Sequence, residues 1–260
     1  LKTHSKICLV VRQESDGIRR YMHLGTGNYN PFTSKIYTDL GLLTSNHEIG
    51  EDATHVFNYL TGYSNKREFN HLLVAPVSLR SGLETLIERE IEHARQGRPS
   101  GMIFKVNSVA DQKVITKLYE ASKAGVRQDL IVRGICCLRP GVEGVSEKIR
   151  VRSIIGRFLE HSRIYYFENG GKPEIYCGSA DLMERNLSRR VEILFPVIDQ
   201  EILDHLKQNL DLMLSDNTLA FNLQQDGSYR RISKKAQDPE INSQLKLLEW
   251  YAEENPIGSV

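Results

Sequence analysis

The sequence is poor in several features that would classify a protein at once. Its 260 residues include one Trp and four Cys, and no Cys spacing is typical of a metal site. No apolar run approaches the roughly 18 residues of a membrane-spanning helix, and no signal-peptide pattern opens the chain. We therefore expect buried, reduced thiols and a cytoplasmic protein with no integral membrane segment, while peripheral membrane association stays open. The cysteines are Cys8, Cys136, Cys137 and Cys177.

An excess of charge of one sign is also lacking. The chain has 34 Lys plus Arg against 33 Asp plus Glu, a formal net charge of +1. Because a nucleic-acid coat needs a large positive excess, we expect no nucleic-acid partner, and any anion site must be a local concentration of charge. Gly25-Thr26-Gly27 lacks the Gly-Lys-Ser/Thr of a phosphate-binding loop. The basic run from Arg230 to Lys235 favours a solvated strand or loop over a polyanion patch.

Hydrophobic periodicity predicts alternating strands and helices, the order typical of α/β layering. Between residues 102 and 133 the order strand, helix, strand suggests a right-handed parallel crossover. Ligands of open α/β sheets bind beyond the carboxyl ends of the strands, where Lys105, Asn107 and Arg133 lie. The predicted strands are 6–12, 18–24, 72–75, 102–106, 128–133, 149–155, 163–167 and 174–177. The predicted helices are 48–60, 83–96, 111–124, 201–214 and 243–253, with a polar linker at 64–70.

Two short motifs place a histidine two residues before a cation. They are His4-Ser5-Lys6 and His161-Ser162-Arg163, and each precedes a strand-like stretch and a small-residue turn, Gly25–Asn28 and Gly178–Asp181. A neutral imidazole is a nucleophile that can attack phosphorus. The cation lies on the same strand face and can neutralise phosphoryl oxygens, while a second histidine would protonate the leaving oxygen. The two motifs suggest one split phosphate-handling site.

This pairing resembles the phospholipase D superfamily, whose members build one active site from two His-x-Lys half-sites. That superfamily usually has an acidic residue five positions after the Lys, where this chain has Val11 and Glu168, and here Arg163 replaces the second Lys. Longer stretches narrow the resemblance. Six stretches are similar in sequence to the bacterial ATP-dependent polyphosphate kinases that work through a phosphohistidine. They are residues 20–30, 37–44, 48–52, 130–141, 161–170 and 179–186.

The resemblance implies an α/β fold with a phospholipase D-like mixed sheet flanked by helices. It divides the chain into the end of a first catalytic domain, residues 1–68, and a complete second one, residues 69–255. It implies reversible transfer of the terminal phosphate of ATP to polyphosphate, with Mg carried by the nucleotide. The chain has no initiator Met, so we expect a C-terminal fragment of a homo-oligomeric enzyme, and the activity of the fragment alone stays open. The family's metal-associated positions lie upstream of the phosphorylated histidine.

The resemblance also implies roles for single residues. His4 matches the histidine that takes the γ-phosphoryl group, and His161 matches a second histidine that contacts the nucleotide phosphates across the site. Tyr37 and Arg133 match nucleotide-contacting positions, the tyrosine beside the base and the arginine on phosphate oxygens. Eight further residues are expected to line a polyanion-binding site: Lys6, His23, Arg80, Lys105, Asn107, Arg139, Arg163 and Asn186.

Two other functions stay open at this point. A phospholipase D-like phosphodiesterase would use the same two histidines and turn over a diester without ATP. A non-catalytic nucleotide or polyphosphate-binding module would melt at a higher temperature with ligand, yet release no ADP. Single residues have plainer alternatives too: a structural hydrogen bond for His23, an internal salt bridge for Arg133 and packing beneath a loop for Tyr37.

Overall fold

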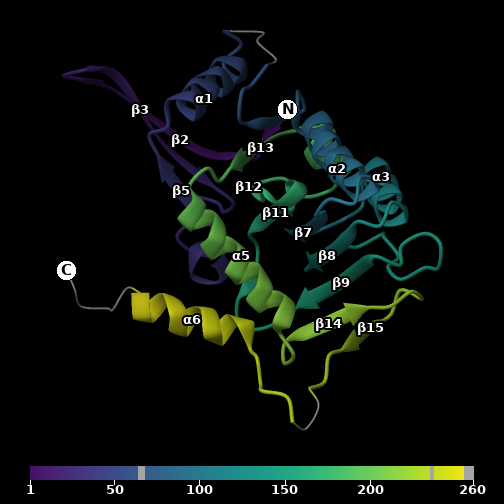
Figure 1. The fold of residues 1–260 in the computed structure, drawn as a ribbon. Coiled ribbons are helices and arrows are strands. Elements are labelled where there is room, and N and C mark those ends of the chain that lie inside the picture. The colour runs from purple at the N-terminus through teal and green to yellow at the C-terminus, as the bar shows by residue number, and fades with distance from the viewer. Residues whose placement is uncertain (64–67, 235–236, 255–260) are drawn as a thin grey trace.

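The computed structural model describes residues 1–63, 68–234 and 237–254. Most of the expected linker at 64–70 lies outside the described residues, as do Lys235 and residue 255. Figure 1 shows one large central sheet with helices on both faces and a smaller sheet, built from the N-terminal residues, beside it. In the described part of the chain, no helix has the length and apolar character needed to cross a membrane.

Among the described residues the larger sheet has ten strands. They are β1 (Lys2–Thr3), β6 (Leu73–Ala75), β7 (Gly101–Val106), β8 (Arg127–Val132), β9 (Ile149–Ile154), β11 (Arg163–Phe167), β12 (Glu174–Gly178), β13 (Arg190–Pro196), β14 (Ala220–Leu223) and β15 (Tyr229–Arg231). Their spatial order is β1-β13-β12-β11-β7-β8-β9-β14-β15, with β6 also paired to β13. The pairs β7–β8 and β8–β9 are parallel, whereas β11 is antiparallel to both β7 and β12. The sheet is therefore mixed, as the sequence predicts.

Helices cover both faces because successive residues of a strand point to opposite sides of the sheet. On β7, Phe104 belongs to one hydrophobic core and its neighbour Ile103 to the other. The helices that pack on the Phe104 face are α2 (Leu79–Arg95), α3 (Gln112–Lys123) and the short α4 (Glu184–Ser188). Those on the Ile103 face are α5 (Gln200–Ser215) and α6 (Ser243–Glu254), while α1 (His47–Leu60) belongs to the same core but packs on the smaller sheet.

The smaller sheet consists of β2 (Lys6–Glu14), β3 (Gly17–Gly25) and β5 (Gly41–Thr44), all antiparallel, in the order β2-β3-β5. Two short parallel pairings join this N-terminal region to the rest of the molecule. Strand β1 pairs with β13, and β4 (Tyr37–Thr38) pairs with β10 (Leu159–Glu160). Each pairing places one of the two histidine motifs directly beside the other half of the chain.

Every predicted strand and helix overlaps one in the structure, but several elements were not predicted. Helix α2 begins at Leu79, one turn earlier than expected, because the fully buried Leu79 extends the apolar stripe that Leu83 continues. The expectation of buried thiols is wrong for two cysteines: all four are free, but Cys8 and Cys137 are exposed. Strands β1, β4, β5, β10, β13, β14 and β15 and helix α4 were not predicted from the sequence.

Candidate active site

His4 lies where the chain leaves the larger sheet for the smaller one, between β1 and β2. Its main-chain N–H donates to the carbonyl of Val191 on β13, at 2.9 Å. Its Nδ1 is 2.8 Å from a carboxylate oxygen of Glu192, which is completely buried, whereas the His4 side chain remains 21% exposed. A carboxylate on Nδ1 favours the tautomer whose lone pair is on Nε2. The geometry therefore favours a lone pair on Nε2 of His4, the form that a nucleophilic imidazole requires.

Glu192 is held by two further polar side chains. Ser179 donates to its Oε2 at 2.5 Å and Asn186 donates to its Oε1 at 2.6 Å. Asn186 is only 2% exposed. Its amide supports Glu192, the partner of His4, and the expected lining of the polyanion site by Asn186 stays a prediction.

His161, just after β10, has a matching carboxylate. Its Nδ1 is 2.9 Å from both oxygens of Asp39, which follows β4 and also accepts a 2.6 Å hydrogen bond from Thr26. Burial lowers the pKa of His161, and the positive charges of Arg163 and Lys6 lower it further, while Asp39 opposes both effects. Because the pKa lies below its ordinary value, the imidazole is mainly neutral near pH 7.

Each histidine thus takes its carboxylate from the other half of the chain. Glu192 lies 188 residues from His4, and Asp39 lies 122 residues from His161. The positions that the superfamily pattern pointed to do not supply them: Val11 is exposed on β2, and Glu168 accepts a 2.6 Å hydrogen bond from Tyr166. No local sequence signal identifies the two acids, because the pairings β1–β13 and β4–β10 bring them into place.

Each motif cation contacts the histidine of its own motif. The Lys6 ammonium donates to the main-chain carbonyl of His4 at 2.5 Å. Burial lowers the Lys6 pKa to about 8, Arg163 lowers it too, and the carboxylates of Glu192, Asp39 and Asp181 oppose this. Because charged groups of both half-sites shift the pKa of Lys6, Lys6 lies where the two half-sites meet.

Arg163 contacts the second histidine directly. Its Nη1 is 3.1 Å from Nε2 of His161 and donates to the His161 carbonyl at 2.9 Å. Its Nε and Nη2 donate to the two oxygens of Asp181, at 3.3 and 3.1 Å. The guanidinium is therefore fixed against His161, with Asp181 as its counter-ion.

Three more of the expected residues gather around His161. The Tyr37 ring lies 4.8 Å from the imidazole ring, centroid to centroid. The Asn107 amide donates to the His161 carbonyl at 3.1 Å, and Nε of Arg133 donates to the Asn107 side chain at 2.8 Å. The structure therefore brings Tyr37, Asn107 and Arg133 together with His161 at the ends of β4, β7 and β8.

Two expected lining residues are engaged elsewhere. Arg80 donates two hydrogen bonds to Asp111, at 2.9 and 2.6 Å, in an ion pair that joins the start of α2 to the start of α3. Lys105 is 1% exposed and is bonded to Ser162 and Glu160. These partners engage its ammonium in the structure, and lining of the site by Lys105 stays a prediction.

The last two lie apart from the histidine pair. His23 is on β3, and its Nδ1 is 2.8 Å from the hydroxyl of Tyr29. Arg139 is exposed in the segment after β8, where its main-chain N–H donates to the Tyr119 hydroxyl at 2.9 Å. Neither contact joins these residues to His4 or His161.

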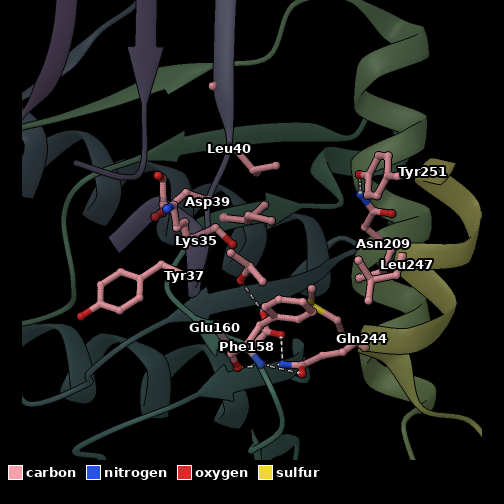
Figure 2. Close-up of a pocket in the computed structure, with 17 residues that line it drawn as sticks. Lys35, Tyr37, Asp39, Leu40, Phe158, Glu160, Asn209, Gln244, Leu247 and Tyr251 are labelled. Atoms are coloured by element: carbon pink, nitrogen blue, oxygen red, sulfur yellow. Dashed lines mark hydrogen bonds between the residues drawn. The ribbon is translucent and has the colours of Figure 1, made fainter. Parts of the chain in front are cut away.

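A cavity of about 420 Å³ lies beside the segment that joins β10 to β11 and carries His161 (Figure 2). Its lining is largely apolar, and at one end Thr38, Glu160 and Gln244 are joined by hydrogen bonds. Glu160 and Ser162 belong to its lining, whereas His161 and Arg163 do not. Tyr37 and Asp39, which contact His161, also line the cavity, so it adjoins the His161 side of the site.

The carboxylates near the histidines offer no protein-only magnesium site. Glu192, Asp39 and Asp181 are each bound to a histidine or an arginine. In the part of the chain that the structure describes, no group of three or more His, Cys, Asp and Glu could hold a metal ion. The donor set of the described residues therefore does not fit a resident Mg²⁺, which prefers several free oxygen ligands.

Two family models match the chain. The one described as polyphosphate kinase C-terminal domain 1 matches residues 1–66, and the one described as polyphosphate kinase C-terminal domain 2 matches residues 72–244. The crystal structure of polyphosphate kinase from Porphyromonas gingivalis aligns with a TM-score of 0.92 at 37% identity, covering 98% of this chain and 39% of that one. This likeness confirms the mixed α/β fold.

Curated relatives carry the same description. The polyphosphate kinase of Thermosynechococcus vestitus is 59% identical over 231 residues, which are 89% of this chain and 32% of the relative. That of Bacillus cereus is 52% identical over 247 residues, 95% of this chain and 35% of the relative. The chain thus spans about a third of the length of the curated relatives that it matches.

Proposed function

This chain belongs to the polyphosphate kinase family, and from that premise we propose that it carries the phosphohistidine site of an ATP:polyphosphate phosphotransferase. The observation that carries the proposal is the reciprocal arrangement of the two imidazoles. Each has a carboxylate on Nδ1 that comes from the opposite half of the chain. Such an arrangement leaves Nε2 of His4 for chemistry, while Nε2 of His161 accepts from Arg163, and Lys6 contacts the main chain of His4.

In the proposed first step, Nε2 of His4 attacks the γ-phosphorus of ATP. An N–P bond forms, the bond from phosphorus to the bridging oxygen breaks, and ADP leaves with that electron pair. In the second step a terminal oxygen of polyphosphate attacks the same phosphorus and the N–P bond breaks, which regenerates His4 and lengthens the chain by one phosphate. The reverse sequence forms ATP from ADP through the same intermediate.

His161 is proposed to act on the leaving oxygen. In its neutral form Nδ1–H donates to Asp39 and Nε2 accepts from Arg163. Once protonated on Nε2, it would donate a proton or a hydrogen bond to the bridging oxygen as charge develops there. The low pKa of His161 makes this form a minority near pH 7 and a growing fraction as the pH falls.

The cations supply most of the proposed stabilisation. Phosphoryl transfer depends mainly on position and on neutralising the charge of the transferred group. Lys6 and Arg163 would act on the phosphoryl oxygens, while Arg133 and Tyr37 would hold the nucleotide. Mg²⁺ would arrive on the phosphates of ATP, because the described side chains form no cage for it. The division into catalytic domains at residues 68 and 69, the cytoplasmic location and a homo-oligomeric enzyme belong to the same proposal.

The test uses a chimera in which this chain replaces the matching third of the Thermosynechococcus vestitus polyphosphate kinase. With ATP and Mg²⁺ we expect acid-insoluble polyphosphate and an equal amount of ADP, and both should vanish in His4→Ala. Cleavage of a phosphodiester without ATP by the same two histidines would favour the phospholipase D-like alternative. A melting temperature that rises with ATP, without release of ADP, would favour a binding module.

A further inference from the structure

Lys105 is buried against the two residues that flank His161 in the sequence. Its ammonium donates to the Ser162 hydroxyl at 2.7 Å and to the Ser162 carbonyl at 3.3 Å, and it lies 3.1 Å from a carboxylate oxygen of Glu160. An ammonium has three protons, so these contacts use all of them. Lys105 therefore holds the residues immediately before and after His161.

Glu160 extends this contact to two other elements. The oxygen that faces Lys105 also accepts a 3.0 Å hydrogen bond from the hydroxyl of Thr38 on β4. Its second oxygen accepts a 2.7 Å hydrogen bond from the Gln244 amide on α6 (Figure 2). Glu160 is only 4% exposed, and each of its oxygens has a partner. The carboxylate thus joins β7, β4, β10 and α6 at one point.

The contact with Thr38 reaches the catalytic pair. The main-chain carbonyl of Thr38 accepts the N–H of His161 at 3.2 Å, and the residue after Thr38 is Asp39, which holds Nδ1 of His161. A shift of Thr38 relative to Glu160 would therefore move Asp39 and His161 relative to each other. Buried charges are poor contributors to stability when apolar side chains of similar size could replace them. The surrounding face is an apolar core, so a charge pair here suggests a geometric role.

We propose that Lys105 and Glu160 are positioning residues for phosphoryl transfer, which fix His161 and Asp39 in the arrangement that the reaction needs. The inference rests on the proposed function and adds two residues that touch no substrate. Lys105 lies at the carboxyl end of β7, where a ligand contact is expected from the sequence. A positioning role explains why its ammonium is buried there instead.

The experiment compares Lys105→Met, Glu160→Gln and the double variant in the same chimera. Each single change should lower kcat about 10- to 100-fold, because small displacements of catalytic groups are costly. The KM for ATP should stay within about three-fold, because ground-state contacts are unaltered. In the double variant no buried charge is left unpaired, so the melting temperature should return toward the parent value while kcat stays low.

The double variant separates positioning from simple structural support. If the pair served stability alone, kcat would recover together with the melting temperature, and that result would overturn the inference. A kcat within about two-fold of the parent in a folded Lys105→Met variant would also overturn it. The matched control is Glu174→Gln, which removes the ion pair with Arg89 at the other end of β12 and should leave kcat unchanged. If the parent chimera makes no phosphohistidine, the proposed function itself fails and takes this inference with it.

Discussion

Single ionisable groups set the pH range in which the site can work. Lys6 is the clearest case, because burial lowers its pKa to about 8. A lysine with a lowered pKa is charged below that value and neutral above it. If its charge stabilises the phosphoryl group, activity must fall as the pH rises through about 8.

The first prediction concerns Lys6→Arg. A guanidinium remains charged over the whole range, so the decline of kcat/KM near pH 8 should move to clearly higher pH even if the maximal rate is lower. The measurement is the pH profile of kcat/KM for ATP, which reports the free enzyme. A decline that stays near pH 8 in the variant would assign it to another group.

The second prediction concerns Asp39→Asn. The negative charge of Asp39 raises the pKa of His161 against the effect of burial, so its removal should lower that pKa further. A general acid must carry its proton, so it acts at a pH below its pKa. The part of the pH profile of kcat that depends on protonated His161 should therefore shift to lower pH, and the overall rate should fall. Asp16→Asn, which removes the partner of Arg19 at the exposed tip of the β2–β3 hairpin, is the control. If this part of the pH profile does not shift in Asp39→Asn, Asp39 does not influence the pKa of His161.

At the scale of elements, the shortest strands position the site residues, and they were the hardest to predict from the sequence. Long periodic segments such as β2, β3 and α1 were predicted from the sequence to within a few residues. Strands β1, β4 and β10 have two residues each, so no periodicity can reveal them, and their form depends on the partner strand. Those three strands carry or adjoin His4, Asp39 and His161. The histidines and cations were therefore predicted from local motifs, whereas Asp39 and Glu192 required the tertiary pairings.

The third prediction tests the close approach of β12 to β13, where Ser179 and Glu192 meet behind His4. A Cβ on Gly178 would lie 2.0 Å from the main-chain carbonyl oxygen of Ile193, so Gly178→Ala must displace backbone. We expect a loss of about 2 kcal/mol in the free energy of unfolding, or a Tm lower by about 4 to 8 °C. Gly101→Ala, whose Cβ would meet its nearest atom at 3.7 Å, should change Tm little when both are measured by calorimetry. Equal Tm values for the two variants would refute the steric account.

At the scale of the whole molecule, a nearly neutral chain contains a concentrated site. The net charge is +1, yet Lys6, Arg163, Lys105 and Arg133 converge on the segment around His161. Composition alone predicted only that any anion site would be local. The convergence arises because β1 pairs with β13 of the larger sheet and β4 pairs with β10, so each histidine meets a carboxylate from the other part of the chain.

The most direct test of the account is to label the protein with γ-labelled ATP and Mg²⁺ and then treat it with acid and with alkali. The chimera with the Thermosynechococcus vestitus enzyme should carry label that is stable in alkali and lost in acid, as a phosphohistidine is. The label should map to the peptide that contains His4 and disappear in His4→Ala. Label that persists in folded His4→Ala, or its absence from a chimera that binds ATP, would contradict the claim that His4 is the nucleophile.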